Sequence, residues 1–324
     1  MSTATAVPQT YELEGDDARD TLKGVGRRQL LRDSFERFRA ADGFSHARAL
    51  AFQIVLTAFP ALIAVVGLTV DLDQENLRRL IQETLQGIAP GPAGEILTQA
   101  FRQGSEAASD SGAAVFIGLA AALIAATGAM GQIERGANRI YGIESDRGTL
   151  RKYTTASVLA LTVGVLILLA FVLFVAGSAI EVAGAATGWS DTALTIWQIA
   201  RWPIALVFVL TGFSLLFKVV PRRRQPSMSW LASGAIVTVV LWFAFTGLLS
   251  VYLTASKAFG DTYGPLAGII GLLLWAFLTS LAVYFGLASA AQLEAVRASV
   301  TKPATDEDAN PSPTVSATAA KRPL

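Results

Sequence analysis

The chain of 324 residues is 52% hydrophobic and 16% charged, with a mean hydropathy of +0.48 and a formal net charge of +1. Soluble domains carry about 25% charged residues, so this composition favours a membrane protein and gives no basis for binding an acidic polymer such as nucleic acid. Cysteine is absent and His46 is the single histidine, which excludes disulfides, thiol catalysis and metal sites built from several histidines.

The N-terminal part of the chain is expected to lie outside the bilayer. Residues 1–22 are polar and acidic, which is typical of a disordered segment, and they lack the apolar core of a cleavable signal peptide. Residues 23–45 place apolar side chains at helical spacing among several arginines. This pattern predicts a basic amphipathic helix on the cytoplasmic membrane surface, and packing against other cytoplasmic segments is the alternative.

Six stretches are apolar and long enough to cross a bilayer, which takes roughly 20 residues. They predict an all-α fold, a polytopic bundle of six transmembrane helices, at about 47–70, 113–133, 154–182, 197–219, 230–253 and 265–287. We assign residues 46–294 to this membrane domain and the Ala-, Pro-, Thr- and Ser-rich residues 295–324 to a disordered tail. The polar loop 71–112 contains two apolar faces at helical spacing, which predict amphipathic helices that cap the outer side of the bundle.

The first two predicted spans carry unusual residues. Gln53 is a polar group within a membrane span and must face protein or water. Pro60 removes a backbone donor and should bend the same helix near its middle. In the second span, small residues recur four apart and predict a helix that lies inside the bundle; they are Ala114, Gly118, Ala122 and Ala126.

A charged segment follows the second span directly. Glu134 and Asn138 share one helix face, and Arg139 lies on the adjacent one. This arrangement fits either a solvated helix end or the polar mouth of a passage beneath a packed helix. If the segment is a polar mouth, these three residues form the inner rim of a substrate path and Tyr263 lies at its outer rim. Glu294, near the end of the last span, is a further candidate for this path.

The distribution of Lys and Arg sets the predicted orientation. Basic side chains are concentrated before the first span, after the second, after the fourth and after the sixth, and the alternate loops are poorer in them. By the positive-inside rule, both termini are then cytoplasmic, in a multi-pass protein of a bacterial inner membrane.

Several motifs in a fixed order resemble those of the YihY/BrkB family of bacterial inner-membrane proteins, some of which were formerly mislabelled ribonuclease BN. The motifs are ALAFQIVLTAFP at 49–60, NRIY at 138–141, FKVVP at 217–221, YGPLA at 263–267, LWAFL at 274–278 and FGLASAAQLE at 285–294. The resemblance implies six transmembrane helices and an inner-membrane location. It implies no cofactor, and transport of a lipid or another amphiphile is the activity commonly suggested for the family.

The residues themselves give little support to enzymatic chemistry. His46 has no partner of catalytic type nearby, the carboxylates are scattered along the chain, and no phosphate-cradling Walker sequence occurs. The centres of the spans are uncharged, which offers no support for ion coupling. We therefore expect a non-enzymatic transporter or flippase of a lipid-like amphiphile, with membrane lipids as partners. The alternative is a membrane scaffold or envelope assembly factor that binds an envelope protein or a second copy of itself.

Overall fold

The computed structural model describes residues 4–10, 12–67, 74–110, 112–186, 188–255, 259, 262–300 and 302–303. Within these residues every regular element is a helix, which confirms the all-α fold. Six helices are long and apolar enough to cross a membrane: α3 (Gly43–Gly67), α6 (Gly112–Ile140), α7 (Thr149–Ala186), α8 (Asp191–Val219), α9 (Met228–Ala255) and α11 (Ala267–Arg297). Most of the predicted tail lies outside the described residues.

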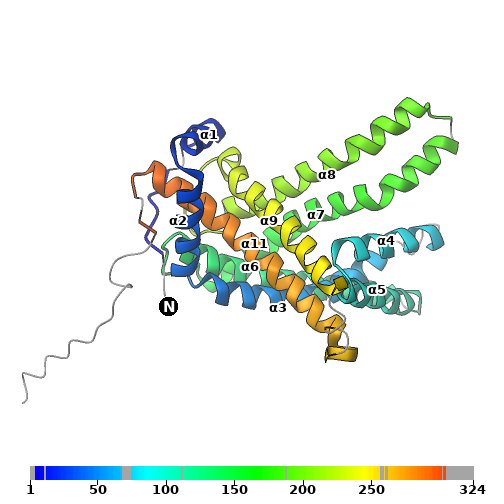
Figure 1. Cartoon of the computed structure of the whole chain (residues 1–324). Coiled ribbons are helices and arrows are strands. Elements are labelled where there is room, and N and C mark those ends of the chain that lie inside the picture. The colour runs from blue at the N-terminus through cyan, green and yellow to red at the C-terminus, as the bar shows by residue number, and fades with distance from the viewer. Residues whose placement is uncertain are drawn as a thin grey trace, which may run out of the picture.

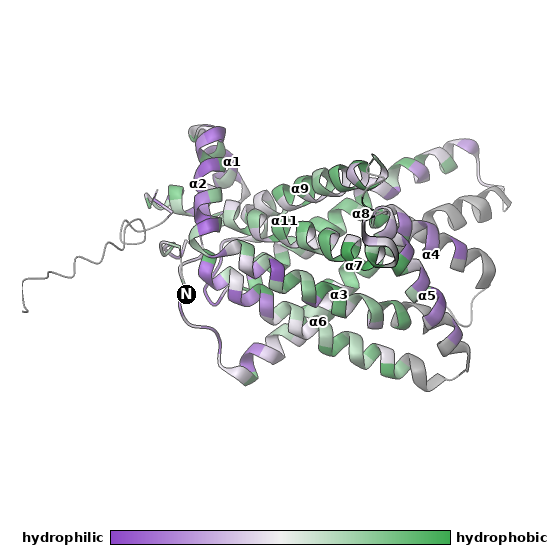
Figure 2. Ribbon diagram, turned by 60° about the horizontal axis from the view of Figure 1, so that its bottom comes forward, coloured by the Kyte–Doolittle hydropathy of each residue, from purple (hydrophilic) through white to green (hydrophobic). Residues whose placement is uncertain are grey.

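The six long helices form one elongated bundle (Figure 1). Helix α3 packs against α6 and α11, α9 packs against α11, and α7 pairs with α8. Apolar residues dominate the long helices, whereas polar residues gather at the two ends of the bundle (Figure 2). One end carries α1 (Gly15–Gly24), α2 (Arg27–Ala40) and the loops after α6 and α8, and we call it the basic end. The other end carries α4 (Gln74–Ile88) and α5 (Pro92–Asp110).

The N-terminal segment is more ordered than its composition predicts. The backbone N–H groups of Ala4 and Val7 donate to the carbonyls of Arg139 and Tyr141, and both side chains are buried. Helix α1 follows and packs against α9. Residues 4–10 and 12–22 are thus placed against the bundle, because backbone hydrogen bonds that composition does not reveal fix a segment with few apolar side chains.

Helix α2 has both buried and exposed apolar side chains. Phe38 is buried and packs edge-on against Phe44, with ring centroids 5.0 Å apart. Leu31 and Phe35 are exposed. Since α2 also packs along α11, the helix both docks on the bundle and leaves an apolar strip uncovered.

The two ends of the bundle have separate cores. At the basic end one continuous core joins the ends of α6, α8, α9 and α11, and its largest members include Phe217, Trp230 and Tyr284. At the other end a second core, smaller among the described residues, places the apolar faces of α4 and α5 against Leu62 of α3 and Leu272 of α11. The sequence prediction of two amphipathic capping helices is confirmed, and we call this pair the α4–α5 cap.

Helix α6 corrects one sequence prediction. Helix α6 packs on α3, but three of its large side chains, Phe116, Ile117 and Ile124, are more than two thirds exposed. A single stripe of small residues covers only one face of a helix. Helix α6 therefore lies at the edge of the bundle rather than inside it.

Candidate functional site

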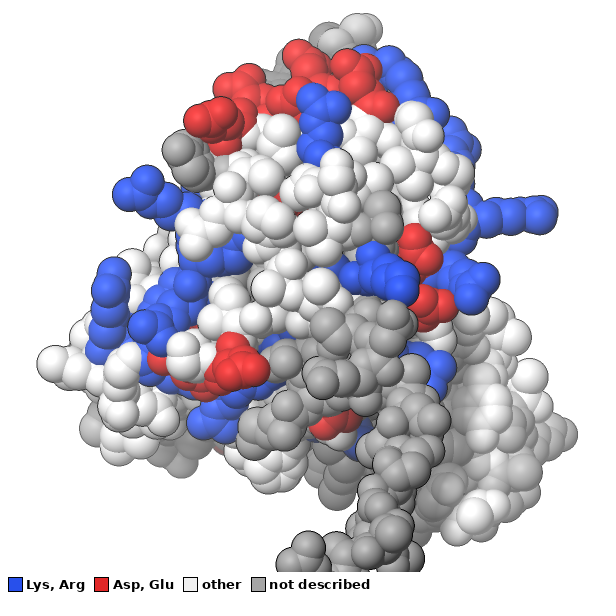
Figure 3. All heavy atoms as spheres, turned by 90° about the vertical axis from the view of Figure 1, so that its left-hand side faces the viewer, with Lys and Arg blue, Asp and Glu red and all other residues white. Residues whose placement is uncertain are grey.

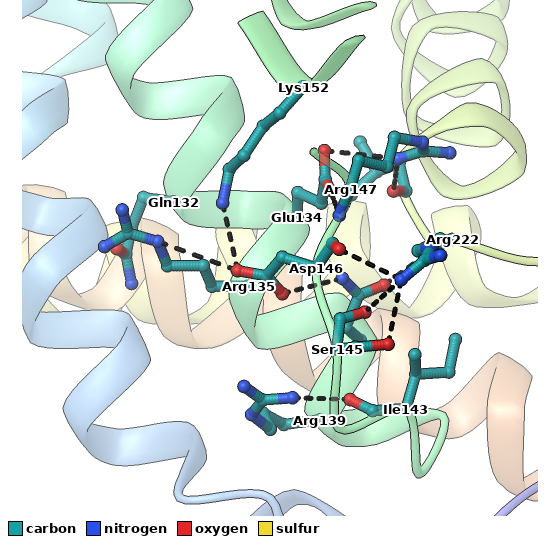
Figure 4. Close-up of polar contacts among 12 residues, drawn as sticks. Gln132, Glu134, Arg135, Arg139, Ile143, Ser145, Asp146, Arg147, Lys152 and Arg222 are labelled. Carbon is teal, nitrogen blue, oxygen red and sulfur yellow. Dashed lines mark hydrogen bonds and ion pairs between the residues drawn. The ribbon is translucent and has the colours of Figure 1, made fainter. Parts of the chain in front are cut away.

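A network of polar side chains joins the ends of α6 and α8 at the basic end (Figure 4). Glu134 is buried and pairs with Arg147, with 3.1 Å between Oε2 and Nη1. The Arg147 guanidinium also donates to the carbonyls of Val219 (2.9 Å), Val220 (2.7 Å) and Pro221 (3.1 Å). A helix leaves its last carbonyls without partners, so one arginine satisfies the end of α8 and ties it to α6.

Asn138 of α6 connects the loop after α6 with the loop after α8. Its side chain is fully buried; Nδ2 donates to Asp146 Oδ1 at 2.9 Å, and Oδ1 accepts from the backbone N–H of Arg222 at 2.8 Å. Lys152 Nζ lies 3.1 Å from the other oxygen of Asp146. Partial burial alone would raise the pKa of Asp146, but the hydrogen bonds from Asn138 and Lys152 and the charge of Lys152 outweigh it. The pKa lies below its ordinary value.

Arg139 closes the turn after α6. Its Nη1 donates to the Ile143 carbonyl at 2.6 Å, and the Ile143 N–H donates to the Asn138 carbonyl at 2.7 Å. Gly142 within this turn has a φ of +74°, a conformation that favours glycine. Arg139 thus ties the end of α6 to the turn that follows it.

A second group of polar residues lies around the end of α11. Glu294 is fully buried and forms an ion pair with Arg223, whose side chain is 3% exposed. The hydroxyl of Thr10 donates to the same carboxylate oxygen, and the Arg223 guanidinium lies 4.8 Å from the centre of the Tyr141 ring. This pair joins the N-terminal segment, the loop after α8 and the last helix.

Arg37 of α2 completes this second group. It is fully buried, and its Nε donates to Gln292 Oε1 at 2.8 Å. Its Nη1 donates to the carbonyls of Thr5 (2.8 Å) and Ile140 (3.0 Å). Burial lowers the pKa of Arg37 to about 10, although Tyr141 and Glu294 act in the opposite direction.

The structure brings together four of the seven predicted path residues. Glu134, Asn138 and Arg139 form one polar group, and Glu294 lies in the neighbouring one, all at the basic end. Gln53 lies deeper in α3 and faces α6, since a Cβ on Gly128 would come within 3.1 Å of its Oε1.

The remaining two predicted path residues lie elsewhere. Pro60 is inside α3, which continues as a helix to Gly67. Tyr263 lies near the other end of the bundle and is exposed, with its ring centroid 4.9 Å from that of Phe259. A role for any of the seven in a substrate path stays a prediction.

Sequence reasoning missed the arginines that organise these groups. In the sequence, Arg37, Arg147 and Arg223 belong to the basic residues that predict a cytoplasmic surface, a pattern that the positive-inside rule produces in any membrane protein. Lys and Arg do gather over this end of the molecule (Figure 3). Their burial depends on partners far away in the chain, such as Glu294 for Arg223, and no local spacing signals such a pair.

Comparisons with known proteins identify the family. The family described as Virulence factor BrkB matches residues 34–311. The ribonuclease-like protein YfkH of Bacillus subtilis is 28% identical over 260 residues, covering 79% of this chain and 92% of its own. The UPF0761 membrane protein Smlt0865 of Stenotrophomonas maltophilia is 26% identical over 303 residues, which are 89% of this chain and 65% of that protein. No solved structure matches. With its six long apolar helices, this chain is a membrane protein that belongs to the BrkB family.

Proposed function

We propose that this protein moves a lipid-like amphiphile between the leaflets of a bacterial inner membrane, without enzymatic chemistry. In this proposal the basic end and both termini face the cytoplasm, in accordance with the gathering of Lys and Arg at that end. The uncharged centres of the spans suit acyl chains.

The observation that carries the proposal is the unequal packing of the two ends. The core of the basic end joins helices from nearly the whole chain, and two buried ion pairs, Glu134–Arg147 and Arg223–Glu294, reinforce it. Among the residues that the structure describes, the core beneath the α4–α5 cap is separate and smaller. Elements with fewer buried apolar contacts open locally at a lower free-energy cost, so the cap is the part best suited to move.

Release of the cap would uncover apolar surface on the membrane-spanning helices. The cap residues Leu85, Leu97 and Phe101 cover Leu62 of α3 and Leu272 of α11. An amphiphile could pass its tail along this surface while its headgroup stays near the polar faces of α4 and α5. We therefore assign the cap as the gate.

A cross-link between cap and bundle tests this assignment. The chain contains no cysteine, so a single introduced pair gives an unambiguous disulfide. A Cβ on Gly271 of α11 would lie 3.8 Å from the Cβ of Ala93 of α5, which is about the mean separation in disulfides. We expect the oxidised Ala93→Cys, Gly271→Cys protein to lose movement of a fluorescent phospholipid in reconstituted vesicles, and a reductant to restore it.

The matched control joins two helices that the proposal leaves together. A Cβ on Gly212 of α8 would lie 3.9 Å from the Cβ of Leu166 of α7, so Leu166→Cys with Gly212→Cys cross-links that pair. Oxidation of this control should leave lipid movement unchanged. Equal movement by the oxidised cap variant would exclude the cap as the gate.

Absence of movement in every variant, for several headgroups, would favour the scaffold alternative. The exposed Leu31 and Phe35 of α2, with Phe44 at the start of α3, would then form the docking surface for an envelope protein or a second copy. In-cell cross-linking would distinguish a scaffold from a transporter, because a scaffold should be cross-linked to a partner protein in a fixed stoichiometry.

A further inference from the structure

An arginine-lined cavity lies at the basic end, between the loop after α6 and the loop after α8. Its volume is about 360 Å³, and its lining consists of Arg147, Gly148, Arg151, Arg222, Arg223 and Arg224. Gly148 directly precedes α7, and a Cβ there would meet no atom within 4 Å. The leading N–H groups of a helix have no partners within that helix, so the start of α7 adds to the positive potential of the arginines, of which Arg147 and Arg223 already pair with carboxylates.

Two of these arginines form a fixed wall. Arg147 is held by Glu134 and by the last carbonyls of α8. Arg223 is held by Glu294 and by the carbonyls of Val7 and Pro8. Because both guanidinium groups are anchored before any ligand arrives, the cavity needs little reorganisation to receive an anion.

Two other arginines keep donors available. Arg151 is exposed, and within the described part of the chain its side chain has neither a hydrogen bond nor an ion pair. The Arg222 Nη1 donates to Ser145 Oγ at 2.8 Å and to the Asp146 carbonyl at 3.0 Å. These contacts engage the Nη1 atom and fix the direction of the side chain. The guanidinium forks can therefore bind phosphate oxygens.

A groove lies between α7 and α8, close to the cavity in the chain. It has a volume of about 390 Å³ and is lined by Thr154, Thr155, Val158, Leu159 and Thr162 of α7 and by Leu215 and Val219 of α8. The hydroxyls of Thr154 and Thr162 donate to carbonyls of their own helix, at Arg151 and Val158. These donors are thus satisfied, and the groove offers an acyl chain a predominantly apolar surface.

The linings of the cavity and the groove are neighbours in the chain on both α7 and α8. On α7, Arg151 lies one turn before Thr154 and Thr155, on the same face. On α8, Val219 precedes Arg222 by three residues, and Arg147 of the cavity donates to the Val219 carbonyl at 2.9 Å. The groove residues lie within the candidate membrane spans, whereas the cavity arginines, apart from Arg151 in the first turn of α7, lie in the loops just outside.

We propose that this composite site binds one anionic phospholipid from the leaflet at the basic end, with its phosphate in the arginine cavity and an acyl chain in the α7–α8 groove. Charge complementarity favours the anionic headgroup, and the adjoining apolar groove within the spans favours a lipid over a free anion. The site requires binding alone, so it stands whether or not the protein moves lipid.

Lipid retention by the full-length protein tests the site. The protein is purified in a neutral detergent, and bound phosphatidylglycerol and phosphatidylcholine are quantified by native mass spectrometry. Combined Arg151→Gln and Arg222→Gln should weaken phosphatidylglycerol binding roughly tenfold and leave phosphatidylcholine unchanged. Arg28→Gln, at an exposed position of α2, removes a charge from the same end without touching the cavity and should have no effect.

The groove and the identity of the anion are tested separately. Val158→Phe narrows the groove from an exposed position of α7, so it should weaken phosphatidylglycerol binding while the arginines remain in place. Inorganic phosphate should not displace the lipid at millimolar concentration. Displacement by phosphate together with indifference to Val158→Phe would reassign the cavity to a free anion, and equal binding of the two lipids would overturn the proposal.

Discussion

Helix α11 contains two glycines whose surroundings differ as the two ends of the bundle differ. At Gly286, near the basic end, a Cβ would lie 2.6 Å from the Gly234 carbonyl oxygen, so α9 and α11 touch through their backbones. At Gly271, nearer the cap, the nearest heavy atom to such a Cβ would lie 3.6 Å away. The same helix is packed without spare room at one end and with ordinary spacing at the other.

The polar residues follow the same division. The basic end contains two ion pairs, and Arg37 is buried there with hydrogen bonds to its neighbours. This end is therefore held by polar contacts as well as by close packing. Helix α8 shows the contrast along its own length, since Ser214, Leu216 and Phe217 are buried, whereas Trp202 and Val207 are exposed. We therefore expect the basic end to be the more stable half of the bundle.

The largest expected effect comes from removing Glu294. Glu294→Ala leaves the buried Arg223 without its counter-charge and should destabilise the protein by about 3–5 kcal/mol, measured by thermal unfolding in detergent. Glu83→Ala, at an exposed position of the cap helix α4, should change stability by less than about 0.5 kcal/mol. Equal losses of stability in the two variants would contradict the expectation that the basic end is the more stable half of the bundle.

Substitution of the two glycines of α11 should change stability less, but it compares the two ends within a single helix. Gly286→Ala forces α9 and α11 apart and should cost about 1–3 kcal/mol. Gly271→Ala has room for its methyl group and removes a flexible residue from a helix, so it should stabilise the protein by roughly 0.5–1 kcal/mol. Thermal unfolding of both variants in one detergent measures the two changes in stability. If both changes had the same sign, the predicted difference between the two ends would be wrong.

The sequence predicted the architecture well because hydropathy and periodicity are local. The six long helices need only a sufficient apolar length, and the cap helices need only apolar faces such as Leu85 with Ile81. The N-terminal segment could not be predicted in this way, since Ala4 and Val7 are held by backbone hydrogen bonds to residues near position 140.

The candidate site was predictable only in part. Glu134 and Asn138 stood out because they are polar residues on one face directly after a membrane span. Their actual partners, Arg147 and Arg222, lie in loops whose relative position depends on how α6, α7 and α8 pack. Pairing between such loops is a tertiary property, and so the partners of Glu134 and Asn138 emerge only from the folded chain.

The smallest expected effect is a dependence of stability on acidic pH at the basic end. The pKa of Asp146 is lower in the folded protein, through its contacts with Asn138 and Lys152, than the ordinary value of about 3.9. A carboxyl group of this kind contributes stability above its unfolded pKa and loses that contribution as the pH falls through its folded pKa. The unfolding temperature of the wild-type protein should therefore drop below about pH 4, and Asp146→Asn should reduce that drop. Asp191→Asn, at the exposed start of α8 near the other end, supplies the control. If it flattened the acid response as much as Asp146→Asn, the response would belong to the general charge of the protein rather than to the loops that close the basic end.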